Sequence, residues 1–249
     1  MWSGDYYQER DGVRVISCKT CPKFDADKVK CTIPFGSPIR KCISAAQEAN
    51  LHSLAGKDLL EIGFGKHSIP RRLVEDAGGT WTGIEPMLPA SQPAALGRGG
   101  HGQVAEIPFA DATFDVVAGI QTLEHWEEPL PNSERTSGYA ECLREIHRVL
   151  KRGGTIYFDA PVNLHGHEMF IAGDFERIRG LLDPALWQDI KIERWRENYA
   201  PLERYPTPAG DVNSWQQSVT SYSDDLLRDI RENRSVSLVT ISAVKRVDN

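Results

Sequence analysis

The sequence predicts an α/β fold, with a seven-stranded sheet that is mostly parallel, one antiparallel pair at an edge, and helices on both faces. Three observations support this prediction. Residues 58–76 have the pattern of a short buried strand, a turn with two glycines and a helix, which opens many nucleotide-binding sheets. Apolar strands and amphipathic helices then alternate up to residue 160. Two strand-like stretches follow these units and predict the antiparallel pair.

Length and charge limit the possible functions. A chain of 249 residues is long enough for one α/β domain with a modest addition. The net charge of −6 argues against a broad basic face for nucleic acid, although a local basic pocket is compatible with it. The N-terminus has no apolar core of a signal peptide, and no apolar run approaches the roughly 18 residues of a membrane span. We expect a cytoplasmic protein, and the sequence leaves its oligomeric state open.

The chain divides into three predicted regions: an N-terminal arm or lid over residues 1–36, a Rossmann-like core with the glycine turn over residues 37–162, and an insert with strands that complete the same sheet over residues 163–249. Four cysteines crowd together near the arm with the pattern Cys-x2-Cys-x9-Cys-x10-Cys. Two interpretations stay open, a structural zinc or iron–sulfur site and ordinary reduced thiols. The four residues are Cys18, Cys21, Cys31 and Cys42.

The first half of the predicted fold rests on caps, glycines and apolar spacing. Residues 1–35 are polar, and we expect them to be irregular. Ser37 and Pro38 are typical of a helix start, and apolar residues continue at helical spacing to about Leu54. After the central strand, a helix is expected from about Ser68 to Asp76. Strands are expected at residues 80–86, 103–106 and 113–119.

The second half follows the same signals. Residues 139–150 form a strongly amphipathic helix that the two glycines after Arg152 should stop. We expect further helices at about residues 170–182 and 224–232. The remaining strands are expected at residues 155–160, 190–195 and 236–244.

Polar side chains gather where the predicted parallel strands end, and ligands of open α/β sheets bind at these ends. Glu61, Gly63 and Gly65 end the first strand. Glu85 ends the second, 20 residues beyond Gly65, where an acid accepts hydrogen bonds from ribose hydroxyls in nucleoside-binding folds. Gln121 and the residues that follow it leave the fourth strand on the same side.

Together these segments resemble the class I S-adenosylmethionine-dependent methyltransferases, a Rossmann-like family, and most closely their type 11 small-molecule group. The matching segments are the glycine loop at residues 60–65, the acid of residues 83–85, the stretch at 105–117 and the helix leading into the fifth strand at 143–154. The resemblance implies S-adenosyl-L-methionine as the cofactor. It implies that Glu61 lies near the methionine ammonium and that the following residues surround the nucleoside: Gly63, Gly65, Glu85, Gln103, Ala105, Glu106 and Gln121. The family often has an acid where this chain has Gln103.

The expected reaction is methyl transfer to a small-molecule or saccharide hydroxyl. A hydroxyl acceptor needs a base, and His125, His165 and His167 follow the fourth and fifth strands on the ligand side. A divalent ion is a further possibility, because Glu124, Asp159 and these histidines can converge.

Other functions stay open at this point. They are a cofactor-binding protein without turnover, a scaffold, and a methyltransferase acting on an amine or a macromolecule. A nicotinamide oxidoreductase is disfavoured because Ser68 stands at the third glycine position of the dinucleotide pattern.

Overall fold

In the computed structural model, Ser53–Ile192 and Val239–Asn249 form a larger unit, and Met1–His52 and Glu193–Leu238 form a smaller one. The larger unit contains the predicted cofactor-binding segments. The structure describes residues 7–10, 13–17, 24–25, 30–31, 54–65, 68–128, 137–162, 166–199, 213–218 and 237–247.

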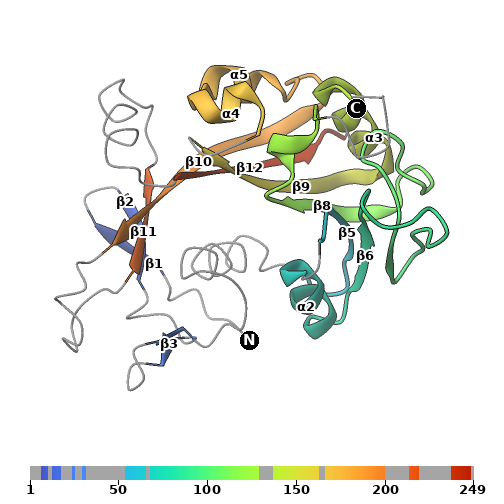
Figure 1. Cartoon of the computed structure of the whole chain (residues 1–249), viewed down its shortest axis with the longest axis horizontal. Helices are drawn as coiled ribbons and strands as arrows, with labels where there is room; N and C mark the ends of the chain where they lie inside the picture. Colours follow the sequence, from blue (N-terminus) through green and yellow to red (C-terminus); the bar gives the residue numbers. More distant parts are fainter. Residues whose placement is uncertain are drawn as a thin grey trace. The chain divides into compact units, whose positions relative to one another are not determined.

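The sheet of the larger unit confirms the predicted architecture (Figure 1). Its strand order is β10-β12-β9-β8-β5-β6-β7, mostly parallel with an antiparallel pair at one edge. The central strand β5 has parallel neighbours on both sides, β6 and β8, so the chain order reverses direction there. Ligands of open α/β sheets bind at such a reversal point. The strands are β5 (Asp58–Ile62), β6 (Thr80–Ile84), β7 (Gly99–Gly100), β8 (Phe114–Ile120), β9 (Leu150–Val162), β10 (Trp187–Tyr199) and β12 (Ser237–Lys245).

The first strand, turn and helix form as the sequence predicts. Four of the five residues of β5 are buried, which explains its apolar residues Leu59, Leu60 and Ile62, and the fourth buried residue is Glu61. Helix α2 (Ile69–Asp76) begins after Ser68, whose hydroxyl oxygen accepts a hydrogen bond from the Arg71 N–H at 2.9 Å. This cap satisfies one of the helix's unpaired N–H groups and fixes the direction in which the chain leaves the turn.

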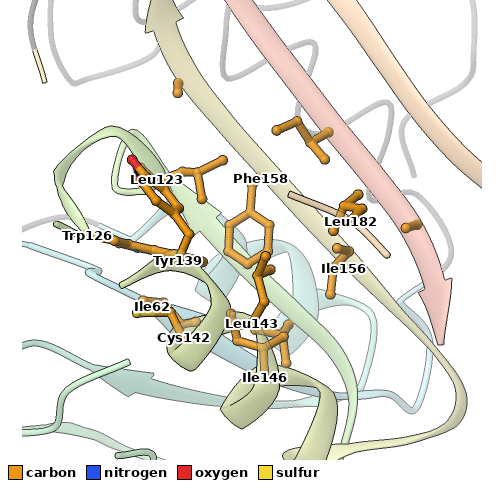
Figure 2. Close-up of a cluster of buried hydrophobic side chains, with 14 of the residues drawn as sticks. Ile62, Leu123, Trp126, Tyr139, Cys142, Leu143, Ile146, Ile156, Phe158 and Leu182 are labelled. Atoms are coloured by element: carbon orange, nitrogen blue, oxygen red, sulfur yellow. Dashed lines mark hydrogen bonds between the residues drawn. The ribbon is translucent and has the colours of Figure 1, made fainter. Parts of the chain in front are cut away.

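The core of the larger unit lies between the sheet and helix α3 (Tyr139–Val149) (Figure 2). The helix presents Tyr139, Cys142, Leu143, Ile146 and Val149 to the sheet, at the spacing of one helical face. Phe158 of β9 packs edge-on against the Trp126 ring, with the ring centroids 5.2 Å apart. The segment after β8 is thereby anchored in the core.

Two short helices, α4 (Glu168–Ala172) and α5 (Phe175–Gly180), replace the single helix expected at residues 170–182. Gly173 adopts a left-handed conformation with φ of 67° and ends α4, and the Asp174 side chain caps α5. A glycine followed directly by a capping acid ends one helix and begins the next. Helix α4 packs against β9.

The third strand is not where the sequence prediction placed it. Residues 103–106 form a tight turn closed by a bridge between Gln103 and Glu106, and the third strand is β7. A Cβ on Gly99 would lie 2.7 Å from the Phe64 ring, and one on Gly100 would lie 2.5 Å from the backbone of Pro93. Only glycine fits at these close approaches. β7 therefore has no apolar side chains, and the hydrophobic pattern of the sequence could not indicate a strand there.

Among the later strands, β9 begins at Leu150, earlier than expected, and β10 is longer than the predicted 190–195. In the smaller unit, the order β1-β2-β11-β10 forms an antiparallel sheet from β1 (Tyr7–Arg10), β2 (Val13–Ser17), β11 (Asn213–Ser218) and the second half of β10. β3 (Phe24–Asp25) pairs with β4 (Lys30–Cys31). The expectation that residues 1–35 are irregular is therefore wrong for these strands, and β11 was not predicted.

The helices expected at residues 38–54 and 224–232 lie outside the described residues. Within the described residues, no helix is long and apolar enough to cross a membrane.

Candidate functional site

A cavity of about 350 Å³ opens at the C-terminal ends of β5, β6 and β8. This is the end of the sheet where the sequence placed the ligand. Most of its wall is apolar, and Glu85 and Glu128 contribute carboxylates. The lining residues are Ile62, Gly63, Ile84, Glu85, Pro86, Met87, Gly102, Gln103, Val104, Ala105, Gln121, Thr122, His125, Trp126, Glu128 and Ser137.

Gly63 forms the floor of the turn and lines the cavity. Its φ is +66°, and its N–H donates to the Ile84 carbonyl at 2.8 Å, so the turn is tied to the end of β6. A Cβ at this position would lie 2.4 Å from Cγ2 of Thr122. The position therefore requires glycine for two reasons, the left-handed backbone and the close approach of Thr122.

Glu85 is held by backbone donors on both carboxylate oxygens. The Gly65 N–H donates to Oε2 at 2.9 Å and the Met87 N–H donates to Oε1 at 3.0 Å. Each oxygen retains a lone pair for another donor, as a ribose diol requires. Gly65 itself does not line the cavity, and its contribution is this hydrogen bond.

Glu61 lies directly behind the turn and is only 2 % exposed. Its Oε2 accepts hydrogen bonds from the Trp81 Nε1–H, at 2.8 Å, and from the Ser68 hydroxyl. Burial raises the pKa of Glu61 to about 7, and the nearby charge of Glu85 adds to the rise, while the two hydrogen bonds oppose it. Glu61 does not line the cavity itself.

The loop after β7 forms another wall of the cavity. Gln103 and Ala105 line it, whereas Glu106 is exposed and does not. A clamp from α3 holds the residues that follow, because the Arg148 guanidinium donates to the carbonyls of Ile107 and Phe109 at 2.9 and 2.8 Å.

Gln121 lines the cavity at the end of β8 with a φ of +52°, which is unusual for a residue with a side chain. Its N–H is held by Asp159, whose backbone oxygen lies at 3.0 Å and whose Oδ1 lies at 3.1 Å. Asp159 is fully buried at the end of β9. Strained backbone that is fixed in this way is common at functional sites.

His125 is the described histidine that lines the cavity. Its Nδ1 lies 2.8 Å from Oε2 of Glu128, and its Nε2 lies 3.8 Å from Oε1 of Glu124. An ionised carboxylate can only accept a hydrogen bond, so the Nδ1 of a neutral His125 carries the proton and Nε2 has the lone pair. This is the arrangement of a base oriented by an acid.

His167 has both ring nitrogens engaged. Its Nδ1 accepts from the Met169 N–H at 3.2 Å, which caps α4, and its Nε2 lies 3.0 Å from Oε2 of Glu127. It therefore has structural bonds at each nitrogen in this conformation. The third candidate, His165, lies outside the described residues.

Glu124 is fully buried beside the site, and neither of its carboxylate oxygens has a hydrogen-bond partner among the described residues. Burial raises the pKa of Glu124 to about 8, and the charges of Asp159 and Glu128 add to the rise.

No group of three or more histidine, cysteine or acidic side chains in the described part of the chain is arranged to hold a metal ion. This includes Glu124, His125, Asp159 and His167 after the fourth and fifth strands. Cys18, Cys21 and Cys42 are outside the described residues, and of Cys31 only the backbone, in β4, is described.

Sequence reasoning missed several residues of the site. They include Thr122 and Trp81. Thr122 approaches Gly63, and Trp81 bonds to Glu61, only because the strands that carry them pair in the sheet. Glu128 had a local signal, because it follows His125 by three residues, the spacing of one helical turn.

Comparison with known proteins identifies the domain. Residues 60–158 match the family model described as "Methyltransferase domain". This segment contains the glycine turn, Glu85, the Gln103 loop and β8 with its exit. Residues 60–158 are a class I S-adenosylmethionine-dependent methyltransferase domain.

Two relatives match parts of the chain that holds this methyltransferase domain. A Mycolicibacterium smegmatis protein named "probable S-adenosylmethionine-dependent methyltransferase" is 31% identical over 117 residues, which are 44% of this chain and 40% of that protein. The demethylmenaquinone methyltransferase of Alkalihalophilus pseudofirmus is 39% identical over 56 residues, which are 22% of this chain and 20% of that protein. The chain thus matches well under two thirds of either relative's length.

A solved structure of a SAM-dependent methyltransferase from Archaeoglobus fulgidus has the same fold as this methyltransferase domain. The TM-score is 0.51 at 18% identity, and the match covers 84% of this chain and 95% of that one. This likeness confirms the Rossmann-like fold predicted from the sequence.

Proposed function

We propose that the protein is an S-adenosylmethionine-dependent methyltransferase that acts on a small-molecule or saccharide hydroxyl. The observation that carries the proposal is the cavity at the end of β5, β6 and β8 inside a methyltransferase domain. The residues present fit the cofactor. Glu85 is fixed by two backbone donors and can accept bonds from hydroxyls, and Gly63 gives the cavity a wall of bare backbone where a Cβ would meet Thr122.

The chain's own residues have distinct tasks in this reaction. The bound cofactor supplies a methyl group on a sulfonium, which is already a good leaving group, so the protein has mainly to orient the acceptor. Glu85 would hold the ribose, and Gln103 and Ala105 would surround the adenine. Glu61 would face the methionine ammonium from behind the turn.

His125 is the candidate base for a hydroxyl acceptor. His125 lines the cavity, and the bond from Nδ1 to Glu128 orients its ring as an acid orients a general base. His125 lines the cavity and His167 does not, so His125 is the better placed of the two described histidines.

Calorimetry with S-adenosylmethionine and S-adenosylhomocysteine tests the cofactor site. Folded protein that binds neither compound would contradict the proposal. Incubation with methyl-labelled cofactor and panels of hydroxyl, phenol and amine acceptors then tests the reaction. Label found only on amines would replace the hydroxyl assignment, and tight binding without transfer to any acceptor would favour a non-catalytic protein.

The N-terminal cysteines belong to a separate proposal, a structural zinc or iron–sulfur site formed by Cys18, Cys21, Cys31 and Cys42. Elemental analysis of the purified protein tests it. A metal content well below one ion per chain would leave the thiols reduced and unligated. We also propose a cytoplasmic location, which fractionation of cells would test.

A further inference from the structure

Trp81 lies in a slot that two glycines leave open. It is 3 % exposed on β6, and its ring covers the paired residues Gly83 and Gly99 of β6 and β7. A Cβ on Gly83 would lie 2.6 Å from the ring's Cζ2, and one on Gly99 would lie 2.9 Å from its Cη2. Two neighbouring strands therefore lack side chains at the place where the indole lies.

Two further side chains fix the ring in this slot. Phe64, in the glycine turn, packs edge-on with its ring centroid 5.4 Å from that of Trp81. The Arg71 guanidinium of α2 lies 4.9 Å from the Trp81 ring centroid, a cation–π distance. The indole is thus held by the turn, the helix and both strands, and its N–H has one direction in which to donate.

That direction is toward Glu61, which receives the indole N–H at 2.8 Å on Oε2. The Ser68 hydroxyl donates to the same oxygen. Among the described residues no hydrogen bond reaches Oε1. Two donors on one oxygen fix the orientation of the carboxylate behind the turn.

These bonds also affect the charge of Glu61. Burial favours the neutral acid, whereas hydrogen bonds to the carboxylate favour the charged form. In the described part of the chain, the charged groups near this cluster are Glu85, at the end of the same strand as Trp81, and Arg71, beyond the ring. Glu85 disfavours a second negative charge, so the donors matter for keeping Glu61 ionised.

We propose that Trp81 is a positioning residue for cofactor binding: its indole N–H orients the Glu61 carboxylate behind the glycine turn, from where it attracts the ammonium group of S-adenosylmethionine bound in the cavity that the turn lines. This inference rests on the proposed function, because it assigns Glu61 to the cofactor. If Trp81 only filled space in the fold, its ring would be enough. Removing the N–H while keeping a ring therefore distinguishes a packing role from a role in orienting Glu61.

The central test compares two tryptophan variants by calorimetry with S-adenosylmethionine and S-adenosylhomocysteine, which both carry the ammonium group. Trp81→Phe keeps a ring in the slot and removes the N–H, and we expect the Kd for both compounds to rise about tenfold. Trp187→Phe is the matched control, because Trp187 is 2 % exposed and packs on His147 outside the cavity. Its Kd values should change less than about twofold, within the scatter expected of a site without contact to the ligand.

A double-mutant cycle tests whether Trp81 acts through Glu61. Adding Trp81→Phe to Glu61→Gln should cause little further loss of affinity, because the carboxylate that the indole orients is already gone. Affinity should increase as Glu61 loses its proton. In Trp81→Phe this increase should occur at a higher pH than in the unaltered protein, because one hydrogen-bond donor to the charged form of Glu61 is missing. Additive effects, or superimposable pH profiles, would overturn the proposal.

A spectroscopic measurement covers the case in which Trp81→Phe does not fold. The Trp81 indole resonance in a ¹H–¹⁵N spectrum should move in Glu61→Gln and when the unaltered protein is saturated with S-adenosylhomocysteine. A resonance that stays in place in both experiments contradicts the assignment. If the unaltered protein binds neither compound, the proposed function fails too, whereas equal binding by the unaltered protein and Trp81→Phe removes only this inference.

Discussion

Glu124 has a carboxyl group that is fully buried without a hydrogen-bond partner among the described residues. Burying an ionised carboxylate costs several kcal/mol, so the group stays neutral to a higher pH than usual. Gly166 packs directly on it, since a Cβ there would lie 2.6 Å from Cβ of Glu124. The chain therefore encloses this acid instead of exposing it to water.

The raised pKa of Glu124 predicts that stability falls as the pH rises. The folded carboxyl has a pKa of about 8 against an ordinary 4.5, so between these values the folded state binds more protons than the unfolded state. The contribution is full below pH 4.5 and is lost as the pH approaches 8. Glu124→Gln should remove about 2 kcal/mol of the decline in unfolding free energy between pH 6 and 7.5. Urea denaturation at both pH values measures it.

Glu176→Gln is the control for this measurement, because Glu176 is exposed on α5 and is not among the charges that raise the pKa of Glu124, so its loss should leave the decline in place. Glu61 also has a raised pKa, but it is present in each of these proteins and cancels in the comparison. A decline that is equally steep in Glu124→Gln would show that Glu124 is not the responsible acid.

Alanine substitutions at Gly63 and Gly65 can distinguish the effect of backbone strain from the effect of a steric clash. Both have positive φ, so alanine costs about 1–2 kcal/mol of folding stability at either position. Only at Gly63 would the new Cβ meet Thr122, at 2.4 Å, whereas at Gly65 it meets no described atom within 4 Å. Gly63→Ala should weaken S-adenosylmethionine binding at least tenfold and Gly65→Ala no more than about threefold, as the cost of reshaping the cavity wall exceeds that of strain alone. Equal losses in calorimetry would refute this distinction.

At the scale of elements, Arg148 connects helix α3 to the loop between the cavity and β8. Its guanidinium donates to the carbonyls of Ile107 and Phe109 and to the side chains of Asp111 and Glu145. The Ile107 N–H in turn donates to Glu145 at 3.0 Å. Burial of Ile107, at 3 % exposure, makes this loop part of the core as well as of the site.

Arg148→Lys keeps the charge but cannot form this forked set of bonds. We expect a loss of about 1–2 kcal/mol in stability and faster hydrogen exchange in residues 103–111, because two loop carbonyls lose their donors. Exchange mass spectrometry measures the loop directly. Arg144→Lys is the matched control, since Arg144 is exposed on the same helix. Unchanged exchange in the loop of Arg148→Lys would mean that the clamp does not order it.

The elements that the sequence predicted well are those whose signal is local. The buried strands β5, β6 and β8 and the apolar face of α3 can each be recognised from the residues of a single element. The strand β7 was missed because it consists of two glycines that are required by distant neighbours, Phe64 and Pro93. Within the site, the spacing to Glu85 was informative, whereas the contact of Trp81 with Glu61 depends on the register of β5 with β6.

At the scale of the whole sheet of the larger unit, the two ends of the parallel strands have different tasks. The cavity lies at the C-terminal ends. At the N-terminal ends, Lys151 at the start of β9 bonds to Asp58 of β5 at 3.0 Å and to Asp115 of β8 at 2.9 Å. The Asp58 N–H also donates to Asp115, at 2.9 Å. This cluster connects three adjacent strands at the edge opposite the cavity.

The separation of the two ends predicts a variant that loses stability and keeps cofactor binding. Burial works against it, but the Asp58 N–H and Lys151 hold the pKa of Asp115 below its ordinary value. The stability from this pairing is therefore present above the ordinary pKa of an aspartate and is lost as the pH falls through the lowered one. Because Lys151 is 38% exposed, solvent screens the pair, and Lys151→Met should cost only about 1 kcal/mol at neutral pH.

Urea denaturation measures that loss, and the difference between Lys151→Met and the unaltered protein should shrink as the pH falls through the lowered pKa of Asp115. Lys191→Met, which removes an exposed charge from β10, controls for the change in net charge. The Kd for S-adenosylmethionine should stay the same in both variants. Loss of the Lys151 cluster at the N-terminal ends of the strands should not change the positions of the residues that line the cavity at the C-terminal ends. A weaker Kd in Lys151→Met alone would show that the packing of β5, β8 and β9 couples the two ends of the sheet, and that the site depends on the whole sheet as well as on the residues that line it.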